Sequence, residues 1–86
     1  MTGNTISVEL CGRLADPCGP VVDLPLPAGE VGVLELLSSL GTHFPPLKPS
    51  LDTGRIRACI NETVVYDDVM IGLDDVVALF PPVSGG

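Results

Sequence analysis

The C-terminal end of the chain carries the residues best suited to chemistry. The last seven residues, from Phe80 to Gly86, read Phe-Pro-Pro-Val-Ser-Gly-Gly. Pro81 and Pro82 fix φ near about −65° and favour an extended, semi-rigid segment, whereas Gly85 and Gly86 lack a Cβ and fit a narrow tunnel. The one reactive group at the tip is a carboxylate. We therefore predict that the C-terminus enters the active site of another protein, with Gly86 as the working group.

A frayed end without a function is the alternative interpretation of the same residues, because the last residues of most domains are poorly ordered. Two terminal glycines do not by themselves decide between the two interpretations. The difference is whether the preceding residues form a folded body that can present the tail.

Length and composition indicate a small aliphatic body. The chain has 86 residues, of which 45% are hydrophobic and only 3% aromatic. A chain of this size buries roughly 60–65% of its unfolded surface, which supports one modest core and no deep catalytic cleft. We therefore expect one domain over residues 1–80, a separate tail over residues 81–86, and no catalytic activity in the chain itself.

Charge argues against several classes of partner. The net charge is −7, with only four Lys and Arg residues. A phosphate backbone or an anionic membrane would repel such a chain, so we expect neither nucleic-acid binding nor membrane binding. No apolar run approaches the roughly 20 residues of a membrane span, and the first residues do not resemble a signal peptide. These features, and an odd number of cysteines, predict a cytoplasmic protein.

The first half of the chain predicts two strands and a helix. Hydrophobic residues alternate over 5–11, which indicates a strand with one better-buried face, and residues 21–26 can form a second strand. Residues 12–20 between them are expected to be a loop. A helix is predicted at about 31–42, because apolar residues recur every three or four positions at Val33, Leu36, Leu37, Leu40 and Phe44.

The second half predicts three further strands. Residues 56–60 and 63–66 are expected to form a hairpin around a two-residue turn at Asn61–Glu62, and residues 76–80 the last strand. Residues 45–54 and 67–75 are expected to be loops. One helix packed on a mixed sheet is the economical way to bury these apolar faces, so the fold class is α+β. The pattern is compatible with a ubiquitin-like β-grasp.

Strand parity suggests a docking face beside the tail. If alternate residues of each strand face the helix, then Val64, Val76, Ala78 and Phe80 face away from it and form an apolar surface. Exposed apolar surfaces often mark interfaces, so we expect partner contact there. The alternative, which the sequence leaves open for Val76 and Ala78, is a central last strand that is buried on both faces.

Other polar residues are predicted to have structural or solvent-facing roles. The cysteines lack metal-ligand spacing, and the acidic pairs lack the remaining ligands of a calcium loop. No Gly-rich phosphate-binding motif is present, so any ATP would be bound by a partner. We expect no metal and no bound cofactor. The residues interpreted in this way are Cys11, Cys18, Cys59, His43, Asn61, Asp67, Asp68, Asp74 and Asp75.

The run Phe80–Gly86 resembles the C-terminal signature of the MoaD family, the small subunit of molybdopterin synthase, within the MoaD/ThiS ubiquitin-like superfamily. Residues 58–62 resemble the family's strand that ends in Asn and a polar residue, and residues 75–78 resemble its acidic turn before the last strand. Leu36–Leu37 with Phe44–Pro45 resembles its helix and helix exit. Two stretches depart from the family pattern. At residues 10–16, family members often have an aromatic-rich strand that runs into an Arg-Glu pair, and this chain does not. At residues 72–75, the turn before the last strand also differs from the family's usual sequence.

The resemblance implies a ubiquitin-like β-grasp body and a non-catalytic, sulfur-donating subunit. A ubiquitin-activating-type adenylating enzyme (MoeB-like) would activate the Gly86 carboxylate with ATP, and a sulfur donor would convert it to a thiocarboxylate. The tail would then enter the large subunit (MoaE-like) and supply sulfur for the dithiolene of molybdopterin, made from cyclic pyranopterin monophosphate. The residues implied in tail insertion are Pro81, Pro82, Val83, Ser84 and Gly85.

Three other functions are compatible with a Gly-Gly tail. A sulfur carrier can serve another pathway, such as the synthesis of thiamine, cysteine or a secondary metabolite. A ubiquitin-like modifier would instead be joined to lysines of other proteins. A stand-alone binding domain would leave the tail idle.

Overall fold

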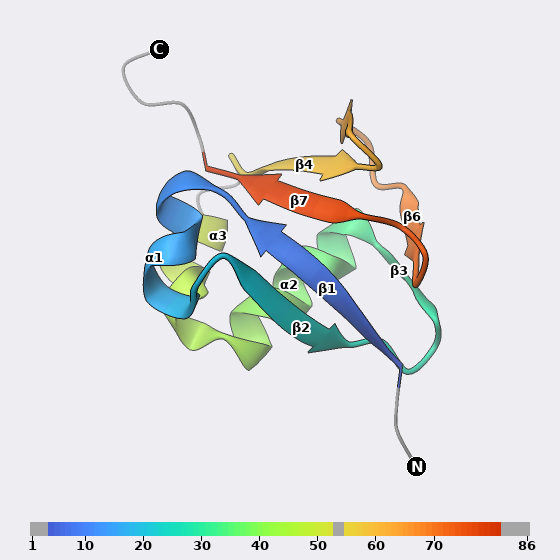
Figure 1. Cartoon of the computed structure of the whole chain (residues 1–86), viewed down its shortest axis with the longest axis horizontal. Coiled ribbons are helices and arrows are strands. Elements are labelled where there is room, and N and C mark those ends of the chain that lie inside the picture. Colours follow the sequence, from blue (N-terminus) through green and yellow to red (C-terminus); the bar gives the residue numbers. More distant parts are fainter. Residues whose placement is uncertain (1–3, 53–54, 82–86) are drawn as a thin grey trace.

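The computed structural model describes residues 4–52 and 55–81. The helices lie in the first two thirds of this part of the chain, among three strands, and four further strands follow them (Figure 1). In chain order the elements are β1 (Thr5–Leu10), η1 (Gly12–Leu14), α1 (Ala15–Cys18), β2 (Val21–Pro25), β3 (Glu30–Gly32), α2 (Val33–His43), η2 (Pro45–Leu47), α3 (Lys48–Leu51), β4 (Arg57–Ile60), β5 (Thr63–Val65), β6 (Met70–Gly72) and β7 (Val77–Phe80).

Five strands form one mixed sheet in the order β2-β1-β7-β4-β5. The first and last strands, β1 and β7, lie side by side and parallel, with Glu9 opposite Ala78, and the other pairs are antiparallel. Figure 1 shows α2 crossing behind this sheet, so one face is covered by helix and the other is open to the viewer. The predicted arrangement, a mixed sheet packed on one main helix, is therefore confirmed.

The core is aliphatic and lies between the sheet and α2. Within the described residues, no polar or charged side chain is buried. The alternation predicted for β1 is confirmed, because its even-numbered residues are buried and its odd-numbered residues are exposed. The buried side chains are Ile6, Val8, Leu10, Leu14, Val22, Leu24, Leu26, Val31, Val33, Leu36, Leu40, Leu47, Ala58, Ile60, Ile71, Val77 and Leu79.

The N-terminus of α2 is held by a residue far away in the sequence. The Leu34 N–H donates to Oδ1 of Asp68 at 3.0 Å, so a carboxylate lies at the positive end of the helix dipole. Gly32 precedes the helix, and a Cβ added there would lie 2.8 Å from the same Oδ1. Gly32 is therefore required for this close approach. Asp68 is exposed, as the predicted solvent-facing role requires, and its cap on α2 is an additional role that the sequence did not predict.

A second, two-stranded sheet was not predicted. Glu30–Gly32 in β3 pairs with Met70–Gly72 in β6, in stretches expected to begin the helix and to form a loop. Three residues are too few for a period-two pattern to be distinguished from a loop. The loops expected at 12–20 and 45–54 likewise contain single turns of helix.

The hairpin turn is confirmed. Asn61 and Glu62 have positive φ angles of 52° and 70°, which is the type I′ geometry that matches the twist of a two-residue hairpin. No helix within residues 4–52 and 55–81 is long and apolar enough to cross a bilayer.

Candidate functional site

The root of the tail is fixed to the body by β1 and the turn that follows it. The Cys11 N–H donates to the carbonyl oxygen of Leu79 at 2.9 Å, which extends the ladder to the end of β7. Pro81 is half-buried beside Gly12, whose backbone has a φ of 58°. A Cβ on Gly12 would lie 3.3 Å from Cγ of Pro81. The chain therefore leaves the sheet at a defined place, between β7 and η1.

The predicted tail residues lie mostly outside the described residues. Pro81 is described, whereas Pro82, Val83, Ser84, Gly85 and Gly86 are not. Their insertion into a partner, and the reactivity of Gly86, therefore remain predictions from sequence.

The structure brings the predicted docking residues together on the sheet face that α2 does not cover, which we call the outer face. The register places Ala78 between Glu9 and Cys59, and Cys59 opposite Val64. Val64, Val76 and Phe80 are 39%, 58% and 38% exposed, and Ala78 is half-buried. The alternative in which β7 is buried on both faces is therefore wrong for Val76. Its position just before β7 places it at the start of the same surface.

Two residues of this region were missed by the sequence analysis. Arg57 lies opposite Phe80 across β4 and β7, and its Cζ lies 5.8 Å from the centroid of the Tyr66 ring. This cation–π contact holds a guanidinium next to the last strand residue before the tail. The expected hairpin register contained the signal, because a turn at Asn61–Glu62 places Tyr66 opposite Arg57.

Cys11 and Cys59 are on or beside the outer face, and the surroundings of Cys11 do not activate it as a nucleophile. Cys11, Cys18 and Cys59 are free and half-buried. Burial raises the pKa of the Cys11 thiol, and the charge of Glu9 and the neighbouring Cys59 raise that pKa further. A thiol with a raised pKa is a poor nucleophile at neutral pH, since the thiolate is the reactive form. In the described part of the chain, no three His, Cys, Asp or Glu side chains lie close enough to hold a metal ion.

The turns at the far end of β4 and β7 are joined by polar side chains. Asn61 Nδ2 donates to Oδ1 of Asp75 at 2.9 Å, and Asn61 Oδ1 accepts from the Val76 N–H at 2.9 Å. The Gly72 N–H donates to Oδ2 of Asp75 at 2.8 Å. The predicted role of Asn61 as a turn residue is confirmed, whereas the purely solvent-facing role predicted for Asp75 is wrong.

The electrostatics of Asp75 follow from these contacts. The hydrogen bond from the Gly72 N–H, followed by that from the Asn61 amide, holds the pKa of the Asp75 carboxyl below its usual value. The ionised form is thus the one that the fold prefers. Because Val76 is part of the outer face, this network also fixes where that surface begins.

Comparisons with known proteins agree with this geometry. The model of the ThiS family matches residues 19–86, which is most of the chain. No curated protein sequence matches significantly. Among solved structures, SAMP1 from Haloferax volcanii superposes with a TM-score of 0.77 at 27% identity, over 95% of this chain and 99% of that one.

Two more distant structures share the fold. A protein assigned as molybdopterin converting factor, subunit 1, from Pyrococcus furiosus has a TM-score of 0.73 at 21% identity, over 92% of this chain and 98% of that one. The small archaeal modifier protein 1 (SAMP1) from Methanosarcina acetivorans has a TM-score of 0.71 at 22% identity, with both chains fully covered. With the mixed sheet on α2, these matches establish the ubiquitin-like β-grasp fold, and the chain belongs to the ThiS family of the ThiS/MoaD ubiquitin-like proteins.

Proposed function

We propose that this protein is the sulfur carrier subunit of a molybdopterin synthase and that its Gly86 carries the sulfur as a thiocarboxylate. The observation that carries the proposal is the sequence Phe-Pro-Pro-Val-Ser-Gly-Gly directly after β7 of a ThiS-family body. The body ends in β7, which is hydrogen-bonded to β1 and β4. The two residues that end in the carboxylate are glycines.

The chemistry requires a partner because the carboxylate alone is inert. A C-terminal carboxylate has a pKa of about 3.5, so it is ionised at neutral pH and resists nucleophiles. In the first step a carboxylate oxygen attacks the α-phosphorus of ATP and pyrophosphate leaves, giving the acyl-adenylate. Hydrosulfide then attacks the acyl carbon and a C–S bond forms as AMP departs. Loss of the proton on sulfur leaves the thiocarboxylate. Dividing one difficult transfer into two activated steps is the advantage of a covalent carrier.

The outer face would hold the carrier on its partners during these steps. Phe80, Val64, Val76 and Ala78 supply apolar contact area next to the tail root, and Arg57 adds a cation there. Binding through this face orients the tail and raises the effective concentration of its terminal atom in the partner's active site. Under this proposal the partners are a MoaE-like large subunit and a MoeB-like adenylating enzyme, and the catalytic acids, bases and ATP site belong to them.

A second candidate function is a ubiquitin-like protein modifier. Its support is the likeness to SAMP1 of Haloferax volcanii, a small archaeal modifier protein, at 27% identity over 95% of this chain. The same acyl-adenylate would then be attacked by a lysine amine, and the product would be an isopeptide at Gly86. A sulfur carrier for another pathway, such as that of thiamine, cysteine or a secondary metabolite, would share the thiocarboxylate but not its acceptor.

Mass spectrometry distinguishes the candidates. The purified protein is incubated with a MoeB-like adenylating enzyme, ATP and sulfide, and the intact mass is measured. A sulfur carrier gains the mass of one sulfur in place of one oxygen, and transfer to cyclic pyranopterin monophosphate with the large subunit identifies the pathway. Gly86 isopeptides on lysines of cellular proteins, without a stable thiocarboxylate, would instead identify a modifier. If a variant without Gly85 and Gly86 still restored molybdenum-cofactor synthesis in cells lacking the native carrier, the proposal would be wrong.

A further inference from the structure

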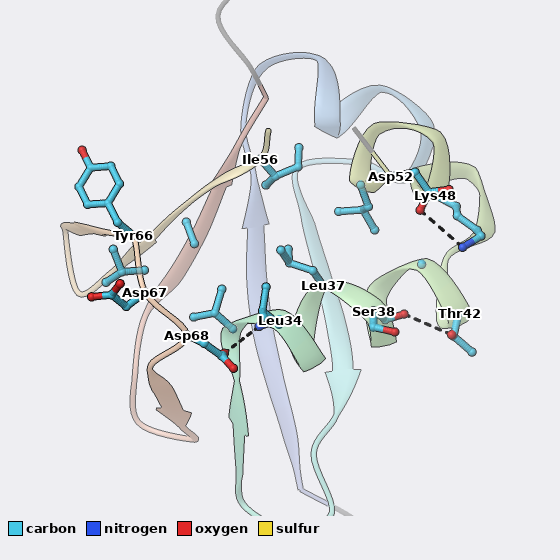
Figure 2. Close-up of a pocket in the computed structure, with 15 residues that line it drawn as sticks. Leu34, Leu37, Ser38, Thr42, Lys48, Asp52, Ile56, Tyr66, Asp67 and Asp68 are labelled. Carbon is cyan, nitrogen blue, oxygen red and sulfur yellow. Dashed lines mark hydrogen bonds and ion pairs between the residues drawn. The ribbon is translucent and has the colours of Figure 1, made fainter. Parts of the chain in front are cut away.

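A hollow of about 530 Å³ lies on the helix-facing side of the sheet, away from the outer face. It is bounded by α2, α3, β4 and β5, and Figure 2 shows Leu37 and Ile56 pointing into it. Cavities that hold several apolar groups span roughly 300–1,000 Å³, so this one is large enough for a few side chains. Its wall is mixed: apolar side chains from α2, α3, β4 and β5 share it with polar and charged residues. The apolar members away from the mouth are Val33, Leu37, Leu51, Ile56, Ala58 and Val65.

The mouth of the hollow carries two of the most exposed apolar side chains in residues 4–52 and 55–81. Leu34 at the start of α2 is 65% exposed and Tyr66 after β5 is 81% exposed. Both border the hollow, and Figure 2 shows the Tyr66 ring directed away from its centre. The same ring contacts Arg57, so Tyr66 stands at the edge shared by the hollow and the outer face. Large apolar side chains that stand in water beside a cavity indicate a surface that another molecule covers.

The edge of the sheet beside the hollow is open. β5 is the last strand in the sheet order. Ile60 and Thr63 flank the two-residue turn and form a hydrogen-bonded pair. Hydrogen-bonded and non-hydrogen-bonded pairs alternate along an antiparallel ladder, so the next pair, Cys59 and Val64, is a non-hydrogen-bonded one. The Val64 N–H and C=O therefore point away from β4, toward the open edge. A strand added there would place alternate side chains over the hollow, because neighbouring Val65 already faces it.

The charges at this rim select the chemistry of the occupant. Asp68 stands at the mouth beside Leu34, and Asp67 stands there below Tyr66 (Figure 2). Among the described residues that line the hollow, Lys48 is the basic one, and it pairs with Asp52 at 3.6 Å. Arg57 lies at the far edge of the mouth, over the Tyr66 ring. The whole chain carries a net charge of −7. A basic occupant is therefore attracted, and a second copy of this chain is repelled.

We propose that the hollow and the β5 edge form a docking site for an extended segment of another protein that carries alternate apolar residues flanked by Lys or Arg. Its backbone pairs with Val64, its apolar side chains enter the hollow past Leu34, and its basic side chains meet Asp67. The site lies on the side of the sheet opposite the outer face. A partner bound here leaves Phe80 and the tail accessible, so this site does not depend on the function proposed above.

The test is a titration of the 15N-labelled full chain with the peptide acetyl-Lys-Val-Thr-Val-Thr-Val-Lys-amide, followed by NMR. We expect saturable shifts of the amides of Leu34, Val64 and residues 65–68. Replacing both lysines of the peptide by Glu, or its valines by Ser, is expected to weaken binding by about tenfold or more, since each removes one of the two kinds of contact.

Variants of the protein locate the site. Leu34→Lys is expected to weaken binding by about tenfold and Asp67→Lys by about threefold. Val21→Lys is the matched control, because Val21 lies on β2, the other edge strand, and is 51% exposed. It is expected to leave the affinity unchanged, as is deletion of Gly85 and Gly86, which abolishes the chemistry of the proposed function.

Several results would overturn the proposal. They are shifts centred on β2 or on the outer face, shifts that do not saturate, or a loss for Val21→Lys equal to that for Leu34→Lys. Each would mean that a cationic peptide is attracted to an acidic protein without a specific site. If Leu34→Lys has the same melting temperature as the wild type, a folding defect is excluded as the cause of its weak binding.

Discussion

Asn61 and Asp75 connect two turns that are 14 residues apart in the sequence, with Asn61 Nδ2 donating to Oδ1 of Asp75 at 2.9 Å. The backbone adds to this contact, because the Asn61 N–H donates to the carbonyl oxygen of Val76 at 2.8 Å. The hairpin β4–β5 and the turn before β7 are therefore joined where the outer face begins. The physical role of this pair is to fix Val64 and Val76 relative to each other.

Stability is expected to depend on the ionisation of Asp75. The folded protein lowers the pKa of this carboxyl, so the ionised carboxylate stabilises the fold. This stabilisation is fully present above the unfolded pKa of about 3.9 and is lost as the pH falls through the lower pKa of the folded state. Asp75→Asn should melt below the wild type at pH 7, and the difference should shrink as the pH is lowered below about 4. Melting temperatures from pH 7 down to pH 2 provide the measurement.

Asp74→Asn is the matched control, since it removes the same charge one residue earlier. Asp74 is exposed, and we expect its replacement to change the free energy of unfolding by less than about 0.5 kcal/mol. A difference between Asp75→Asn and the wild type that stays constant down to pH 2 would contradict the assigned role of the carboxylate.

Gly32→Ala is expected to destabilise the start of α2. The added methyl carbon would lie 2.8 Å from Oδ1 of Asp68, so the carboxylate must move and its bond to the Leu34 N–H is weakened. Loss of such a helix cap costs about 1 kcal/mol, which lowers the melting temperature by roughly 4–8 °C in a domain of this size. Thermal unfolding monitored by circular dichroism measures the change.

A double-mutant cycle identifies the cause. If the methyl group acts through Asp68, then Gly32→Ala should cost little in a protein that already carries Asp68→Ala. Gly41→Ala is the control within the same helix, because its added carbon meets Leu51 and Lys48 at ordinary distances of 3.6 Å and more. It should be neutral or stabilising by up to about 1 kcal/mol. Additive losses for Gly32 and Asp68 would exclude the close approach as the reason.

Phe80→Asp is expected to weaken partner binding more than it weakens the fold. Phe80 is 38% exposed at the end of β7, so the fold loses little apolar burial while an interface would lose an aromatic anchor. We expect at least a tenfold loss of affinity for a large subunit or adenylating enzyme, by calorimetry, with the melting temperature lowered by only a few degrees. A large loss of stability with unchanged affinity would make Phe80 a core residue.

Gly86→Ala is expected to block the terminal chemistry without affecting the body. The methyl group lies beside the reacting carbonyl, where a narrow active site has no room for it. We expect adenylation or sulfur transfer to fall by about tenfold or more, with an unchanged melting temperature. The measurement is the intact mass of the variant after incubation with the adenylating enzyme, ATP and sulfide. If the variant is converted at the wild-type rate, the tail does not enter a narrow channel.

The sequence predicts the parts of this fold in which side chains repeat along one strand or helix. The alternation in β1 and the apolar stripe of α2 are local patterns, so both elements were predicted within about two residues. The turn at Asn61–Glu62 was also predicted, although it lacks the usual glycine. The tail motif is identified from residue types alone, and its chemistry stays a prediction from sequence.

The parts that the sequence did not predict depend on residues that meet only in the folded chain. Asp68 caps a helix that begins 35 residues earlier, and the acidic pairs at 67–68 and 74–75 look alike until their partners are known. The hollow beside β5 is a gap between elements, which no local pattern describes. Arg57 and Tyr66 are the exception, because the predicted hairpin register already placed them opposite each other.

The last strand of the chain occupies the middle of the sheet, with β1 on one side and β4 on the other. During synthesis, β1 leaves the ribosome first and has no parallel neighbour until residues 77–80 have emerged. The central pairing is thus between segments that are far apart in the sequence, and it must wait until β7 has been translated. A product shortened before β7 would expose two unsatisfied strand edges to proteases and chaperones. Molecules that persist in the cell are therefore enriched in those that have been translated at least through Phe80.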